Sequence, residues 1–194
     1  MKKISSLCVF CGSRAGDDPA HAAAARALGE EMAKRRIRLV YGGGRIGLMG
    51  IVAQAVSDAG GQVTGVIPDF LMHLEVGNTQ AGELIITESM HTRKAKMFEL
   101  SDAMIVMPGG IGTLDEAFEI ITWKQLRQHS KPIVLVDVNG YWKPFQALVA
   151  SIVEGGFAHA KVAELYTVVD NVVDVFPALA AAPEPDPVVL TSHL

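Results

Sequence analysis

The chain has 194 residues, of which 49% are apolar, so it is long enough and apolar enough to build the core of one domain. Its formal net charge is −4 and its lysines and arginines are scattered, which argues against binding to a nucleic-acid polymer. No apolar stretch reaches the length of a membrane span and the N-terminus lacks the features of a secretory signal, so we expect a cytoplasmic protein with no membrane partner.

Apolar, β-branched runs predict strands, and stretches with helical spacing lie between most of them. In chain order we expect strand 4–10, helix 19–36, strand 37–41, helix 47–59, strands 62–67 and 83–87, helix 90–100, strand 103–107, helix 113–128, strand 132–138, helix 143–154 and strand 165–169. Strands that are apolar almost throughout are covered on both faces. The pattern therefore predicts the α/β class, with a Rossmann-like, doubly wound, mostly parallel sheet and helices on both faces.

The boundaries of the domain follow from composition. We expect residues 1–179 to form a single Rossmann-like nucleotide-binding domain. Residues 180–194 begin with a proline-rich stretch of low complexity and are predicted to be a mobile tail. The segment from Pro68 to Gly82 lacks strong periodicity, which indicates a loop or a short helix over the ligand crevice.

Cys8 and Cys11 form a C-x-x-C sequence on the first predicted strand. Side chains three positions apart on a strand point to opposite faces, and no second Cys/His pair has the spacing of a zinc site. We therefore interpret them as one core thiol and one thiol at a strand end, in preference to a redox pair or half a metal site.

Three predicted strands end in glycine-rich sequences, at residues 11–13, 42–47 and 109–113. Ligands of doubly wound sheets bind at the carboxyl ends of the strands, so these loops should line one crevice. The residues of the first two loops that we expect to contact a ligand are Gly12, Ser13, Gly43 and Gly44.

The second loop also fits a dinucleotide fingerprint. Gly42-x-Gly44-x-x-Gly47 lies between a strand and a helix, and Asp69 follows the next strand, where a ribose-binding acid belongs. Against an NAD(P)-dependent oxidoreductase, the motif follows the second strand instead of the first, and Pro68 disturbs the strand end. A dinucleotide would also leave the third loop without a role. A non-catalytic nucleotide or cofactor carrier is the other alternative.

The third loop predicts a phosphate site at a helix N-terminus. Its backbone N–H groups and the Thr113 hydroxyl could hold the anion, helped by the helix dipole. No Gly-Lys-Ser/Thr follows, so a monophosphate fits better than a triphosphate. The purely structural alternative is a tight turn in which Thr113 is the N-cap.

Two charged features accompany this loop. Glu116 lies about one turn into the helix, where it could complete a capping box or face a ligand. Arg93 and Lys94 lie near the start of another helix, where positive charge is normally unfavourable. Because local rules are often broken at functional sites, we favour a ligand-binding role for these charges.

Together these residues resemble the Lonely Guy family of cytokinin-activating phosphoribohydrolases. The family hallmark P-G-G-x-G-T-x-x-E is unbroken from Pro108 to Glu116, and the element M-H-x-R-K-x-x-M matches Met90 to Met97. The resemblance runs from about residue 5 to about residue 175 and implies hydrolysis of the N-glycosidic bond of a nucleoside 5′-monophosphate, a cytokinin riboside monophosphate or AMP. The products would be the free base and ribose 5-phosphate.

The resemblance also implies roles for particular residues. Arg93 and Glu116 are the implied catalytic pair. No cofactor is implied, and a homodimer or higher homo-oligomer is. The implied substrate-binding residues, with the adjoining glycine of the loop, are Glu75, Lys94, Gly109, Gly110, Ile111, Gly112, Thr113, Leu114, Asp115 and Thr122.

This chemistry explains an acid beside an anion site. Cleavage of an N-glycosidic bond builds positive charge on the ribose, which the Glu116 carboxylate could stabilise while it orients water or attacks the anomeric carbon. Arg93 could hold Glu116 ionised and bind phosphate or ribose hydroxyls. The histidines are isolated in the sequence, so no metal is expected. Many relatives carry a lysine decarboxylase label, but this sequence lacks the arrangement of a lysine and an acid that pyridoxal phosphate requires.

Overall fold

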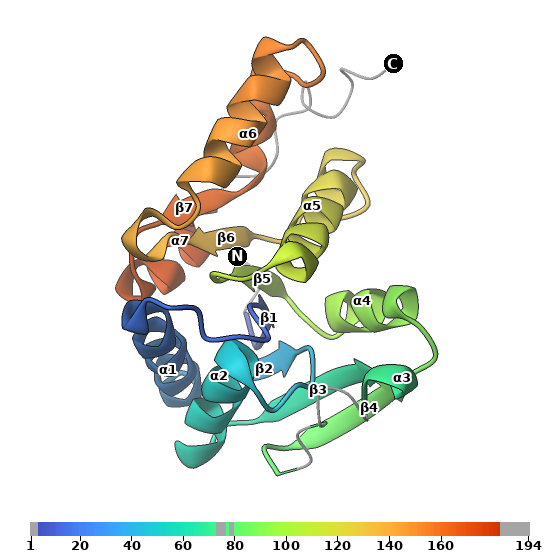
Figure 1. The fold of residues 1–194 in the computed structure, drawn as a ribbon, viewed down its shortest axis with the longest axis vertical. Coiled ribbons are helices and arrows are strands. Elements are labelled where there is room, and N and C mark those ends of the chain that lie inside the picture. The colour runs from blue at the N-terminus through green and yellow to red at the C-terminus, as the bar shows by residue number, and fades with distance from the viewer. Residues whose placement is uncertain (1–3, 73–76, 78–79, 183–194) are drawn as a thin grey trace.

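The computed structural model describes residues 4–72, 77 and 80–182. At its centre is a seven-stranded parallel sheet with the strand order β4-β3-β2-β1-β5-β6-β7 (Figure 1). The strands are β1 Ser6–Phe10, β2 Arg38–Tyr41, β3 Val63–Pro68, β4 Glu83–Thr87, β5 Ala103–Val106, β6 Ile133–Val136 and β7 Thr167–Val169. The predicted α/β class and parallel sheet are confirmed.

Helices connect successive strands. The α-helices are α1 Pro19–Lys34, α2 Gly47–Asp58, α3 Asp69–Met72, α4 Met90–Glu99, α5 Ile111–Gln125, α6 Lys143–Glu154 and α7 Val175–Ala181. Short 3-10 helices occur at η1 Val138–Gly140, η2 Ala160–Leu165 and η3 Val172–Asp174. The model contains no helix that could cross a membrane within the residues it describes.

The sheet separates two apolar cores, as a doubly wound fold requires. One core packs α1, α2 and α7 against the sheet, and the other packs α4, α5 and α6 against the opposite face (Figure 1). Cys11 belongs to the first core and Cys8 to the second, and both are free thiols. The prediction that the two sulfurs face opposite sides of the sheet is therefore confirmed.

The chain changes its winding direction at β1, which pairs with β2 on one side and with β5 on the other. Doubly wound sheets bind ligands at such a switch point, outside the carboxyl ends of the strands. The three glycine-rich loops follow β1, β2 and β5, so the fold brings them together at adjacent strand ends.

Several boundaries differ from the prediction by one to three residues. Helix α5 begins at Ile111, two residues before the expected start, because Gly110 is its N-cap. Helix α7 was not expected and includes Ala180 and Ala181, so the predicted tail boundary falls inside a helix. Residues 183–194 of the predicted tail lie outside the described residues.

Candidate active site

A cavity of about 240 Å³ lies at the switch point of the sheet. Its walls come from the end of β1, the loop after β2, one face of α4 and the first turns of α5. Residues that line it and that the sequence singled out are Ser13, Arg93, Gly110, Ile111, Gly112, Thr113 and Glu116. Residues from distant parts of the chain, Arg93 and Glu116 among them, thus share one cavity.

The N-terminus of α5 opens into this cavity with its N–H groups available. Gly110 caps the helix without a side-chain hydrogen bond, and the first N–H groups of a helix have no acceptor within it. The described residues supply no other acceptor for the N–H groups of Ile111, Gly112 and Thr113. This helix end is therefore suited to an anion such as a phosphate.

The N-terminus of α2, in the fingerprint-like loop, is different. The N–H groups of Leu48 and Met49 donate to the Gly12 carbonyl, at 3.0 and 3.4 Å. A side chain on Gly47, whose φ is 63°, would overlap the backbone of Ser13. These glycines pack one loop against another, and the helix end that a pyrophosphate would need is already occupied.

Glu116 is the sixth residue of α5 and its side chain is mostly buried. A capping box needs the acid at the third helical position, which Thr113 occupies, so that interpretation of Glu116 is wrong. Thr113 is likewise a residue of the first turn and not the N-cap. Glu116 faces the cavity instead, beyond the helix end that can hold an anion.

Arg93 is 5% exposed and crosses the ends of two strands. Its Nε donates to the Val66 carbonyl of β3 at 3.1 Å, and one terminal nitrogen donates to the Gly42 carbonyl after β2 at 2.8 Å. A side chain on Gly42 would overlap the guanidinium, so glycine leaves the room that Arg93 needs. The guanidinium is thus fixed as part of the cavity wall.

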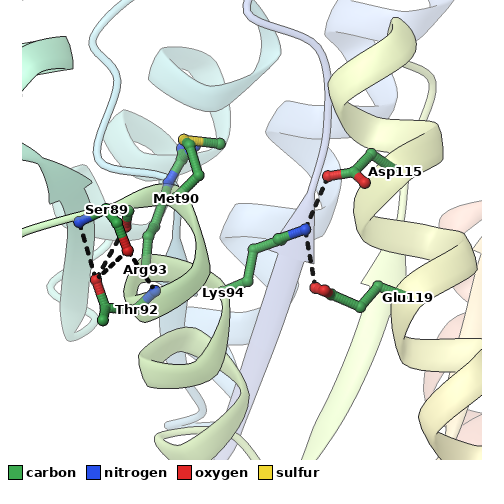
Figure 2. Close-up of polar contacts among 7 residues, drawn as sticks. All are labelled: Ser89, Met90, Thr92, Arg93, Lys94, Asp115 and Glu119. Atoms are coloured by element: carbon green, nitrogen blue, oxygen red, sulfur yellow. Dashed lines mark hydrogen bonds and ion pairs between the residues drawn. The ribbon is translucent and has the colours of Figure 1, made fainter.

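The cap of α4 explains why cations near its start are tolerated. The Ser89 hydroxyl accepts from the Thr92 N–H, and the Thr92 hydroxyl accepts from the Ser89 N–H (Figure 2). This reciprocal capping box satisfies two N–H groups at the helix start. Arg93 and Lys94 extend from the next turn to partners on other elements.

Lys94 reaches across to α5 (Figure 2). It is not among the described residues that line the cavity. Its Nζ lies 2.9 Å from Asp115 and 3.0 Å from Glu119. Burial alone would lower the pKa of Lys94, but its hydrogen bonds to the Asp115 and Glu119 carboxylates more than offset this effect, so the pKa of Lys94 is raised. Lys94 therefore links α4 to α5, and its ammonium, which the sequence predicts to contact substrate, is paired with two carboxylates.

We expect Lys94→Met to lower the free energy of unfolding by about 1–2 kcal/mol at neutral pH, because the hydrogen bonds to two carboxylates are lost. The effect is no larger because Asp115 is largely exposed and solvent screens its ion pair with Lys94. A raised lysine pKa gives stabilisation that is present at neutral pH and lost only as the pH rises through the folded-state pKa. Urea unfolding at pH 7 and pH 9 should give the same difference from the wild type. Lys96→Met, on the exposed face of α4, is the control, and a Lys94 effect no larger than its effect would contradict the assignment.

The charged residues of the cavity affect the pKa values of the two cysteine thiols. Burial raises the pKa of the Cys11 thiol, the Glu116 carboxylate raises it further, and the Arg93 guanidinium offsets part of the rise. The pKa of Cys8 is raised by burial and by the same carboxylate. A raised thiol pKa disfavours the thiolate that redox chemistry needs.

The remaining predicted binding residues lie in several places. Gly12 and Gly109 border a neighbouring cavity, described below. A side chain on Gly43, whose φ is 76°, would crowd Ile67 and Leu84, and Gly44 forms a bridge with Gly77. Neither glycine is among the described residues that line the first cavity. Leu114 packs on the core of its side of the sheet, and Thr122 is exposed near the end of α5. Glu75 lies outside the described residues.

An apolar wall was not anticipated from the sequence. Met90 and Met97 line the cavity on the same side of α4 as Arg93, and Met49, Phe10 and Leu71 add to the wall. Their spacing of three and four residues around Arg93 is the signal that could have placed the two α4 methionines. Leu71 belongs to α3, so the predicted short helix between Pro68 and Gly82 does border the crevice.

Thus the fold and site define a Rossmann-like α/β protein in which a helix end suited to an anion shares a cavity with a buried carboxylate and a buried guanidinium. The family model described as "Possible lysine decarboxylase" matches residues 49–179. The chain is 48% identical over 155 residues to a cytokinin riboside 5′-monophosphate phosphoribohydrolase of Arabidopsis thaliana, covering 80% of this chain and 73% of that protein. It therefore belongs to the Lonely Guy family.

Further comparisons agree with the fold. A second Arabidopsis thaliana protein of the same name is 42% identical over 179 residues, covering 92% of this chain and 78% of its own. The structure of the molybdenum cofactor binding protein of Rippkaea orientalis has a TM-score of 0.69 at 20% identity, covering 93% of this chain and 98% of that one. At that identity the likeness shows a shared fold alone.

The family description raises the question of pyridoxal phosphate. That cofactor needs a lysine for its Schiff base and an acid against its ring nitrogen. No lysine lines the cavity as described, and the nearby Lys94 is paired with two carboxylates. The residues present do not fit pyridoxal phosphate.

Proposed function

We propose that this protein hydrolyses the N-glycosidic bond of nucleoside 5′-monophosphates, namely cytokinin riboside monophosphates and AMP, to the free base and ribose 5-phosphate. The observation that carries the proposal is that one cavity joins the unoccupied N–H groups of α5 to the buried Glu116 and Arg93 side chains. The names of the relatives support the same chemistry.

Each part of the substrate has a chemically suitable part of the cavity. The 5′-phosphate is held by the N–H groups and hydroxyl of Ile111 to Thr113 at the end of α5. The ribose lies toward Glu116, and the base lies against the apolar wall of Met90, Met97 and Phe10. Methionine side chains adapt to different shapes, which suits bases that carry different substituents.

The reaction breaks the bond between C1′ and the base nitrogen. Water supplies the oxygen that ends on C1′ and the proton that ends on the base. The charge of Glu116 stabilises the ribosyl cation, and the same carboxylate either orients the water or forms a transient bond to C1′. Arg93, fixed by two carbonyls, keeps a positive charge beside the carboxylate and the phosphate.

Incubation with AMP and with N6-substituted AMP, followed by chromatography, tests the proposal. Release of the base together with an equal amount of ribose 5-phosphate is the expected result. Retention of NAD without base release would support the oxidoreductase alternative, and nucleotide binding without turnover would support a carrier. Comparison of kcat/KM across monophosphates ranks the bases.

The same proposal includes assembly as a homodimer or larger homo-oligomer in the cytoplasm. Phe70, Ile86 and Ile111 expose more than half of their side chains, and a second copy would remove such apolar surface from water. Light scattering of the purified protein measures the oligomeric state.

A further inference from the structure

Tyr141, in the loop after β6, contacts the glycine-rich loop that follows the neighbouring strand β5. Its hydroxyl donates to the Gly109 carbonyl at 2.6 Å, and it borders a second cavity of about 580 Å³. Ser13 and Gly110 line both cavities, so the glycine loops form the partition between them. Tyr141 stands on the side of this partition that faces away from Arg93 and Glu116.

The hydrogen bond fixes the direction of a peptide group. The Gly109 carbonyl and the Gly110 N–H belong to one peptide unit, and in a trans peptide they point in opposite directions. Because the carbonyl points to Tyr141, the Gly110 N–H points away from Tyr141, and Gly110 also lines the first cavity. The preceding carbonyl, of Pro108, is held in the same manner by the Gly12 N–H at 3.0 Å.

Tyr141 is itself held firmly. It follows a turn in which Asn139 and Gly140 have φ values of 55° and 78°, and the Asp137 carboxylate accepts from the Trp142 N–H. The Asn139 amide donates to Asp18 at 2.8 Å, which ties this turn to the start of α1. The tyrosine ring meets the edges of His21 and Trp142, with centroids 5.3 and 5.0 Å away.

We propose that Tyr141 is a positioning residue that presets the Gly110 N–H to receive the substrate phosphate; this inference rests on the proposed function. Tyr141 does not line the cavity of Glu116, where the proposed ribose would lie, so its effect should fall on phosphate affinity and not on bond cleavage. A preset amide avoids the cost of reorienting the loop on binding.

The test compares Tyr141→Phe, which keeps the ring and loses the hydroxyl, with the wild type. We expect KM for AMP and the calorimetric Kd of ribose 5-phosphate to rise about three- to tenfold, the value of one hydrogen bond. We expect kcat to change less than about twofold, and the Kd of adenosine, which has no phosphate, to stay the same. Tyr166→Phe, which removes a hydroxyl that has no hydrogen bond within the described residues, is the matched control.

The outcomes separate the two proposals. An unchanged Kd of ribose 5-phosphate in Tyr141→Phe would overturn the positioning role, and so would an equal loss of adenosine and ribose 5-phosphate affinity, which would indicate general loosening. Failure of the wild type to release base from AMP would overturn the proposed function, while the ribose 5-phosphate measurement would still test Tyr141.

Discussion

Replacement of Glu116 by glutamine is expected to lower kcat for AMP by about 10²- to 10⁴-fold. Glutamine has nearly the same shape, so the cavity and the helix end that we propose binds phosphate should keep their structure. What the variant loses is the negative charge proposed to stabilise the ribosyl cation and the oxygen proposed to act as base or nucleophile. KM should change little, because the proposed phosphate contacts come from backbone groups of α5.

The measurement is initial-rate formation of adenine by chromatography, with thermal unfolding as a check on folding. Glu119→Gln is the matched control, because Glu119 is on the same helix, less than one turn away, and pairs with Lys94 outside the cavity lining. It should keep kcat within about threefold of the wild type. A Glu116→Gln variant with more than about one tenth of wild-type kcat would refute the catalytic role of this carboxylate.

The sequence was most informative where local patterns decide structure. Residues 83–87 and 143–154 have their predicted boundaries, the second because Pro144 suits only the first turn of a helix. The sequence predicts that α5 starts at Thr113, because threonine is a favourable N-cap residue, whereas Gly110 is the N-cap in the structure. The sequence does not predict helix α7 because this helix is short and contains Pro177.

Long-range partners were beyond the reach of the sequence. The sequence shows that Arg93 and Lys94 are unusual near a helix start, but their partners depend on which strands and helices lie side by side. Arg93 reaches carbonyls of β3 and of the loop after β2 because those strands are neighbours, and Lys94 reaches Asp115 because α5 lies alongside α4. The same applies to Tyr141, which contacts Gly109 from a separate loop.

The second large effect is expected at Arg93, whose replacement by lysine should lower both stability and activity. An ammonium cannot span the Val66 and Gly42 carbonyls as the planar guanidinium does. Leaving one or both buried acceptors unpaired should reduce the free energy of unfolding by about 2–4 kcal/mol. We expect kcat/KM for AMP to fall by about tenfold or more, because the positive charge that shares the cavity with Glu116 is displaced.

Urea unfolding and AMP kinetics measure these two effects, and two further variants separate them. Arg38→Lys loses one hydrogen bond, to the Leu100 carbonyl at the other end of β2, so it should cost some stability and leave kcat/KM unchanged. Gly42→Ala keeps the arginine but fills the space of its guanidinium, so it should lower kcat/KM although Arg93 is present. Full activity in both Arg93→Lys and Gly42→Ala would mean that the arginine only supports the fold, because hydrolysis would then be independent of where its charge lies.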